Sequence, residues 1–174
     1  MQITQPQNDA VGDIVEAVVR VIGKGSREID TTDAISSTAR LAGSFLFRSF
    51  GLTVNDASPG TVVLSEEANV KGPHLVNITY AVLQNMGVSI DNNKVSGSSD
   101  KQPSGSFVEV IGRLQGPALE IMNKYELSFE QMAQSAAIAT AFIIQQSPNI
   151  LPEQGFGTAI YYYIEGAKTF PPEW

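Results

Sequence analysis

Ser128 to Ser147, SFEQMAQSAAIATAFIIQQS, is the stretch that decides the fold of this chain. Ser128 is followed three residues later by Gln131, which is the pattern of a capping box at a helix N-terminus, and Pro148 ends the helix. Residues 136–144 are apolar nearly all round, as is typical of a helix buried on every side. We therefore expect this helix to be the most buried element. The side chains expected to be inaccessible to solvent are Ile138, Ala139, Phe142 and Ile143.

Five further segments show the apolar periodicity or the start and stop signals of helices. Asp9 is a candidate N-cap, Gly51 a C-terminal glycine, and Pro73 and Pro117 suit the first turns of new helices. The segments are 9–23, 32–50, 73–86, 117–125 and 152–168. Two short runs, 61–64 and 107–111, are compatible with strands, and both also fit a helix. The sequence predicts a mainly α, compact multi-helix globular domain.

The chain divides around its most polar stretch, residues 91–106, which reads as a linker or a long surface loop. We interpret residues 1–174 as a single domain. One alternative is a pair of pseudo-symmetric halves, 9–90 and 107–170, because ARLAGSFL at 39–46 resembles AAIATAFI at 136–143. Chance is the competing explanation, since alanine-rich helices resemble one another easily.

Composition excludes several classes of function. The chain has 174 residues, of which 43% are hydrophobic, enough for an ordinary core. It has no cysteine, so disulfide and thiolate chemistry is excluded. The formal charge of −7 argues against binding to nucleic acid or an anionic membrane. Without a signal peptide or a run long enough to span a bilayer, we expect a cytoplasmic location.

No catalytic, metal-binding or cofactor-binding motif stands out. Val21–Ser26 is a fragment of a phosphate loop, and it follows a helix instead of the strand that such a loop requires. One histidine and no cysteine exclude the common zinc ligand sets. We therefore assign no catalytic residue, no metal ligand and no cofactor. An enzyme that uses scattered carboxylates and His74 remains one alternative.

The helix predicted at 73–86 is apolar on two opposite sides. A helix of this kind either lies sandwiched in a core or carries an interface. The first face has Leu75, Ile78 and Val82, and the second has Val76, Tyr80 and Leu83. Because the helix at 128–147 is expected to hold the central place, we predict that the second face binds a partner.

Tyr162 is the fourth predicted partner-binding residue. On the helix at 152–168 it points almost directly away from the expected core stripe, which consists of Phe156, Ile160, Ile164 and Ala167. With Val76, Tyr80 and Leu83, it leads us to predict a protein-interaction module of the adaptor, chaperone-like or inhibitor type. The partner is another protein or a second copy in a homodimer. The alternatives are a small-molecule binding protein with an apolar pocket between helices, or an enzyme without a recognisable motif.

Overall fold

The computed structural model describes residues 2–23, 25, 28–96 and 101–173, and in these ranges the protein is all-helical. Six α-helices and one short 3-10 helix follow one another with no strand among the described residues. They are α1 (Gln5–Ile22), α2 (Thr31–Ser49), α3 (Glu66–Asn85), η1 (Asn92–Lys94), α4 (Phe107–Lys124), α5 (Phe129–Gln145) and α6 (Pro152–Ala167). The mainly α prediction is confirmed. None of these helices is long and apolar enough to cross a membrane.

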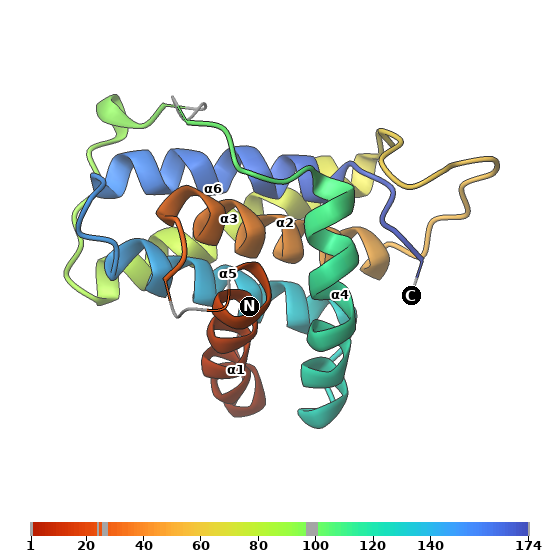
Figure 1. Cartoon of the computed structure of the whole chain (residues 1–174), viewed down its shortest axis with the longest axis horizontal. Helices are drawn as coiled ribbons and strands as arrows, with labels where there is room; N and C mark the ends of the chain where they lie inside the picture. Colours follow the sequence, from red (N-terminus) through yellow and green to blue (C-terminus); the bar gives the residue numbers. More distant parts are fainter. Residues whose placement is uncertain (1, 24, 26–27, 97–100, 174) are drawn as a thin grey trace.

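Helix α2 lies in the middle of the molecule and packs against all five other helices. Figure 1 shows α2, α3, α5 and α6 running roughly along the long axis, while α1 and α4 cross them on one side. The buried apolar residues form one continuous core to which all six helices contribute. The proposed duplication of residues 9–90 and 107–170 stays a prediction.

The most buried element is α2, which corrects the sequence prediction for 128–147. Every residue from Ala34 to Phe47 is buried. In α5, Ile138, Ala139 and Ile143 are buried as expected, but Phe142 is 37% exposed. The reason is that α2 is covered by five helices, whereas the Phe142 side of α5 borders an open groove beside α1.

Helices α2 and α6 cross at unusually short range through two glycines. A Cβ atom on Gly43 would lie 2.5 Å from the carbonyl oxygen of Tyr163 and 2.8 Å from the Cα of Gly166. A Cβ atom on Gly166 would lie 2.6 Å from the carbonyl oxygen of Arg40. Real Cβ atoms do not approach backbone this closely, so the crossing requires glycine at both positions.

Most helix starts follow local capping chemistry. Thr4, Asp30, Ser65, Ser106 and Ser128 each precede a helix and accept a hydrogen bond from a backbone N–H of its first turn. The capping box of Ser128 with Gln131 is confirmed, with both reciprocal bonds present. The expected N-cap at Asp9 is wrong, because Thr4 forms a capping box with Gln7 and begins α1 earlier.

Two prolines that were expected to start helices lie inside helices. Pro73 lies in the interior of α3, which begins at Glu66, and Pro117 lies inside α4, which begins at Phe107. A proline removes one intrahelical hydrogen bond. In both helices buried apolar residues lie before and after the proline, so packing against the core holds the helix together across it.

The two runs that were compatible with strands have different structures. Residues 107–111 form the first turns of α4. Residues 61–64 form no named strand, and Val62 makes a single antiparallel bridge with Thr169. Around this bridge Gly60 N donates to the carbonyl of Phe170 at 2.8 Å, and Val63 N donates to that of Lys168 at 2.8 Å. These bonds tie the base of the loop between α2 and α3 to the end of α6.

Residues 91–106, the predicted linker, are tied to the body of the protein on both sides of 97–100, which lie outside the described residues. Asp91 N donates to the carboxylate of Glu153 at 3.0 Å. Further along, Ser104 donates to Asp33 from its backbone N at 2.8 Å and from its hydroxyl at 2.7 Å. The described parts of this stretch are therefore anchored to α6 and α2.

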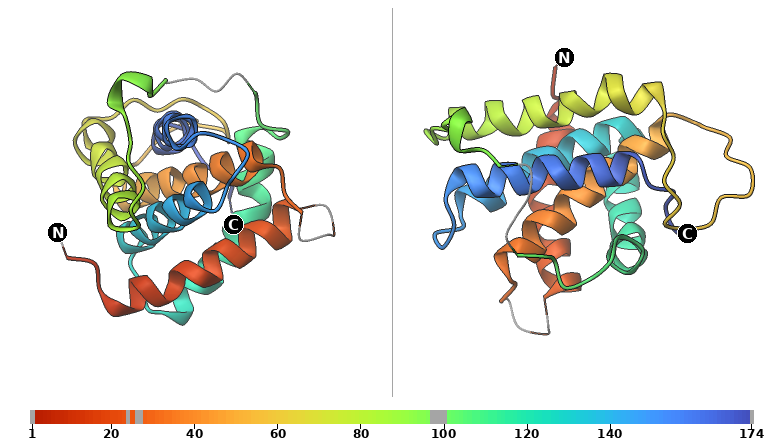
Figure 2. Two further views of the ribbon diagram at one scale, coloured as in Figure 1. Left: turned by 90° about the vertical axis from the view of Figure 1, so that its left-hand side faces the viewer. Right: turned by 90° about the horizontal axis from the view of Figure 1, so that it is seen from above.

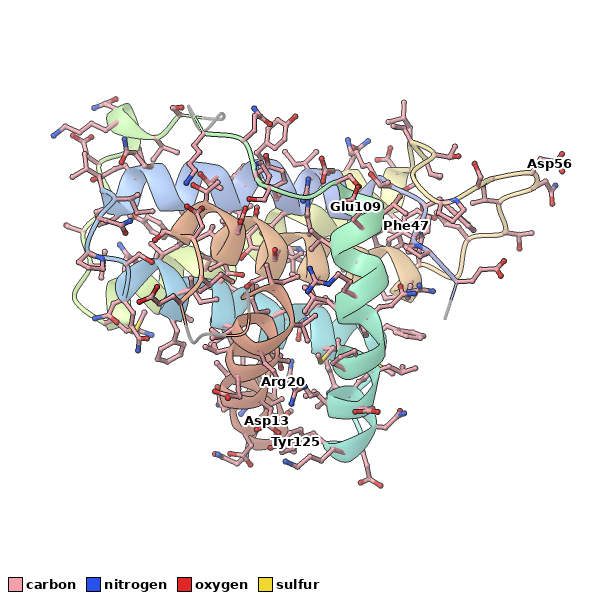
Figure 3. The ribbon with its side chains drawn as sticks, in the orientation of Figure 1. Asp13, Arg20, Phe47, Asp56, Glu109 and Tyr125 are labelled. Carbon is pink, nitrogen blue, oxygen red and sulfur yellow. The ribbon has the colours of Figure 1, made fainter. Side chains whose placement is uncertain are left out.

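The middle of α1 is joined to the C-terminal end of α4 by a polar cluster at the surface, where Asp13 and Tyr125 lie close together (Figure 3). One carboxylate oxygen of Asp13 accepts hydrogen bonds from Lys124 Nζ at 2.8 Å and from the Tyr125 hydroxyl at 2.9 Å. The hydrogen bond from Lys124 is the main cause of a lowered pKa of Asp13. Surface pairs of this kind contribute little to stability, so apolar packing holds the α1–α4 pair.

The glycine crossing gives the first testable prediction. Gly43→Ala should lower the free energy of unfolding by about 3 kcal/mol, because the new methyl group meets backbone atoms that cannot move aside. The matched control is Gly112→Ala in α4, where a Cβ would meet nothing within 4 Å. That change should raise stability by about 0.5–1 kcal/mol through helix propensity. Urea denaturation measures both, and equal effects of the two substitutions would contradict the close crossing.

Candidate interaction surface

A groove runs between α3 and α6, which lie side by side and antiparallel (Figure 2, right). At one end Lys168 Nζ donates to the side-chain oxygen of Asn69 at 3.0 Å. Beyond the other end the rings of Tyr80 and Phe156 have centroids 5.9 Å apart. The two contacts connect α3 to α6 toward opposite ends of the groove.

The groove has a volume of about 340 Å³ and an almost entirely apolar lining. Its walls carry Pro73 and Val76 from α3 and Ile160 and Ile164 from α6. The residues that line it are Ala68, Asn69, Gly72, Pro73, Val76, Asn77, Ile160, Tyr163, Ile164, Ala167 and Lys168. Among them only two asparagines and one lysine bring polar side chains other than the buried tyrosine.

Tyr163 forms a rigid floor below the groove. It is 1% exposed, and its hydroxyl lies 2.5 Å from the hydroxyl of Thr79 on α3. The Thr79 hydroxyl also lies 3.0 Å from the carbonyl oxygen of Ala137 on α5. Burial raises the pKa of Tyr163 to about 12. This hydroxyl pair therefore joins three helices beneath the groove, and the walls are held in place before any partner binds.

The rim of the groove leaves apolar surface in contact with solvent. Ile164 is 52% exposed, and Val76 and Ile160 are half-buried. Gly72 has no neighbouring atom within 4 Å of the position of a Cβ, so the wall is open there. Tyr161, which follows Ile160 on α6, is 49% exposed. An apolar patch of this kind on a small protein is typical of an interaction site.

The structure places one of the four predicted partner-binding residues in the lining of this groove and a second beyond its end. Val76 lines it, and Tyr80 is half-buried beyond one end. The expectation that Leu83 faces outward is wrong, because it is 0% exposed. Helix α3 is covered by α2, α5 and α6, so both of its apolar faces are largely enclosed. Whether any of these residues binds a partner stays a prediction.

The expected outward orientation of Tyr162 is also wrong. It is 4% exposed, and the guanidinium carbon of Arg40 lies 4.7 Å from the centroid of its ring. Arg40 Nε also donates to Glu165 at 2.6 Å, on the same side of α6. The side of α6 that carries Tyr162 therefore faces α2, and the true outer side carries Tyr161 and Ile164.

Sequence reasoning missed Ile160 and Ile164, which it assigned to the core stripe of α6. The two residues are one helical turn apart, and with Val76 they form the apolar walls. The available signal was that α6 is apolar on more than one side, since aromatic and aliphatic residues occupy most positions from 156 to 164. That pattern indicates a helix with two buried apolar faces, or with one buried face and one apolar face exposed to solvent. It does not indicate which face is buried.

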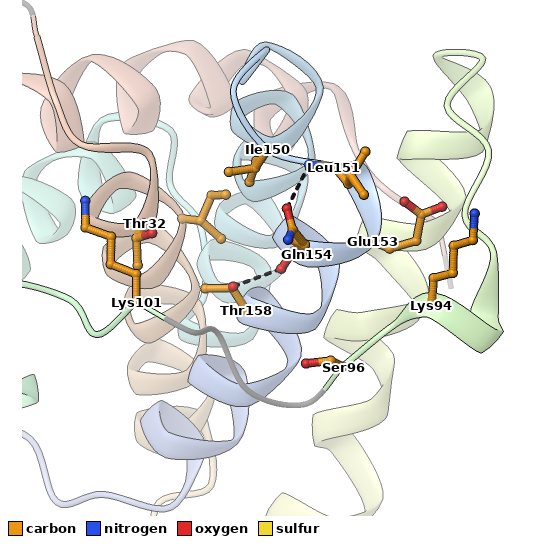
Figure 4. Close-up of a pocket in the computed structure, with 10 residues that line it drawn as sticks. Thr32, Lys94, Ser96, Lys101, Ile150, Leu151, Glu153, Gln154 and Thr158 are labelled. Carbon is orange, nitrogen blue, oxygen red and sulfur yellow. Dashed lines mark hydrogen bonds between the residues drawn. The ribbon is translucent and has the colours of Figure 1, made fainter.

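A larger and more polar hollow of about 540 Å³ lies at the N-terminal end of α6 (Figure 4). Several of its polar groups have local partners. Lys101 pairs with Asp30, and Thr158 donates to the carbonyl of Gln154 at 2.9 Å. Glu153 accepts from Asp91 N, which lowers the pKa of Glu153. The described residues around this hollow therefore form no acid–base pair directed at a ligand.

Metal-binding and catalytic geometry does not emerge elsewhere in the described ranges. No group of three or more histidine, aspartate or glutamate side chains gathers there in a position to hold a metal ion. His74, the histidine of the enzyme alternative, is exposed on α3. Comparison with protein-family models, with curated proteins and with solved structures gives no match.

Burial of Tyr163 is expected to make the free energy of unfolding fall as the pH rises into the alkaline range. Its pKa is about 12 in the folded chain against an ordinary value of 10.0, so the unfolded chain loses this proton first. The contribution to stability is complete below pH 10.0 and is lost as the pH rises toward 12. Tyr163→Phe should cost about 1 kcal/mol at neutral pH, since Thr79 keeps a carbonyl partner. It should also reduce the alkaline loss of stability.

Urea denaturation at about pH 8 and about pH 11 measures both effects. Tyr161→Phe is the matched control, because Tyr161 is its exposed neighbour on α6. This variant should keep the alkaline loss of the wild type. An alkaline loss of the same size in Tyr163→Phe would contradict the role assigned to the buried hydroxyl.

Proposed function

We propose that this protein is a protein-interaction module and that the α3–α6 groove is its binding surface. The observation that carries the proposal is Ile164, which is 52% exposed on the wall of an apolar groove whose floor is fully buried. The adaptor, chaperone-like and inhibitor types all need such a surface. Self-association through the same groove is the second form of the proposal.

A partner that covers the groove removes apolar surface from water. Apolar surface removed from water contributes roughly 25 cal/mol per Å². The gain on binding is reduced when loops or side chains must become ordered. Here the walls are helices joined below by Tyr163 and Thr79, so little ordering remains. A partner that buries Val76, Ile160 and Ile164 would therefore retain most of the apolar gain.

The lining favours binding over chemistry. The polar side chains at the groove are two amides, one ammonium and the buried Tyr163 hydroxyl, whose pKa is raised. A general acid–base or nucleophilic site needs a paired base within hydrogen-bonding distance.

Since the chain lacks cysteine, we propose that it works in a reducing compartment, the cytoplasm.

Selection from a display library of peptides tests the proposed surface. A library of random linear peptides selected on the wild-type chain should yield binders of micromolar affinity. Ile164→Glu should weaken them at least about tenfold, because it places a charge on the apolar wall. The matched control is Leu151→Glu, which changes a residue of similar exposure (59% against 52%) just before α6 and outside the groove.

The control should bind within about threefold of the wild type, a change below 1 kcal/mol. Circular dichroism and urea denaturation verify that both variants fold. Binders that respond equally to the two substitutions, or a selection that yields none, would contradict the proposal. Sedimentation velocity of the wild type and of Ile164→Glu tests self-association, which requires a dimer in the first and a monomer in the second.

A further inference from the structure

The inference concerns the partner of the groove and rests on the proposed function. The walls of the groove are two antiparallel helices, and their apolar residues are spaced by single turns. Ile160 and Ile164 are four residues apart on one wall, and Pro73 and Val76 are three apart on the other. Ridges with this spacing accept the ridges of a third helix. An amphipathic helix laid into a helical groove is a common mode of peptide recognition.

The size of the groove favours one helix over a second copy of the chain. Eleven residues line it. A standard protein–protein interface involves about 20–30 residues on each side. The exposed charged residues Glu66 and Glu67 at the start of α3 bound the same end of the surface as Lys168. A single helix fits the apolar strip between such neighbours, whereas a whole second copy would have to cover them.

The charge of the groove specifies the partner further. The chain carries a formal charge of −7, yet the charged residue that lines the groove is a cation, Lys168. Its ammonium group donates to the neutral amide of Asn69 at 3.0 Å. In the described part of the chain no carboxylate forms an ion pair with Lys168. Lys168 can therefore pair with a carboxylate supplied from outside, whereas Glu66 and Glu67 at the same end would repel one placed toward the start of α3.

We propose that the α3–α6 groove binds one amphipathic helix of a partner protein. The apolar stripe of that helix covers Val76, Ile160 and Ile164. An aspartate or glutamate one turn beyond the stripe reaches Lys168. The apolar contacts supply the affinity, and the ion pair fixes the register and orientation of the helix.

Two synthetic helical peptides test this proposal. Each has about 20 residues, long enough to be helical in water, with leucines at i, i+4 and i+7. One has glutamate and the other lysine at the two positions that flank this stripe on the same face, so either orientation presents the charge to Lys168. Fluorescence anisotropy measures the binding of both peptides to the full chain.

The glutamate peptide should bind the wild type about fivefold tighter than the lysine peptide, as expected for one exposed charge pair changed from attraction to repulsion. Lys168→Glu should reverse this preference, and Lys168→Gln should abolish it. Lys168 is the C-cap residue of α6, so Lys168→Glu also places a negative charge at the end of that helix. Lys168→Gln adds no such charge, so a loss of the preference in this variant is due to the lost ammonium group. Ile164→Glu should weaken both peptides at least about tenfold.

The outcomes separate the two proposals. Equal binding of both peptides, unaffected at Lys168 but weakened by Ile164→Glu, would overturn the acidic partner and leave the groove as a binding surface. Peptide affinity that Ile164→Glu leaves unchanged would overturn the proposed function itself. If neither peptide binds while display selection yields groove binders, the occupant is not a helix. A wild-type dimer that Ile164→Glu dissociates would make a second copy the occupant.

Discussion

The close crossing of α2 and α6 at Gly43 and Gly166 is the contact on which the other packing depends. Two glycines let the backbones approach until Cβ atoms would overlap neighbouring backbone atoms. This approach places Tyr162 and Glu165 of α6 over Arg40 of α2. It also places Tyr163 at the level of Thr79, so that α6 fixes the position of α3 through one buried hydroxyl pair. With α6 and α3 positioned by these contacts, α2 lies at the centre and packs against every other α-helix.

The groove follows from the same arrangement. One side of α6 is committed to α2 and another to the floor below α3, which leaves Ile160 and Ile164 on the rim. Along the opposite wall, Ala68 and Gly72 are too small to fill the space between the helices. Protein interiors are close-packed, so an unfilled apolar strip at the surface between two rigid walls is a place where a further element can pack. The groove is therefore a feature of helix geometry, and it does not depend on a loop.

The buried Arg40 and the half-buried Arg48 belong to the scaffold. Arg40 is 5% exposed and has Glu165, Gly105 and the Tyr162 ring as partners. Arg48 donates to the carbonyl of Pro172 at 2.8 Å, and burial lowers the pKa of its guanidinium to about 10. Perturbed groups often mark functional sites, but structural networks perturb pKa values as well. Here both arginines hold segments distant in the sequence against α2, so the evidence for function comes from the apolar surface.

The sequence by itself determined the helical class and the capping box at Ser128, because these depend on groups within a few residues of one another. It also identified α3 as apolar on two sides, and Val76 of the second side lines the groove. Only the tertiary structure decided that Leu83 and Tyr162 are buried and that Ile164 is exposed. Tertiary packing also decided that α3 and α4 continue through Pro73 and Pro117. The physical reason is that the burial of a face depends on which helix covers it, and that is set by contacts such as Gly43 with Gly166, between residues far apart in the chain.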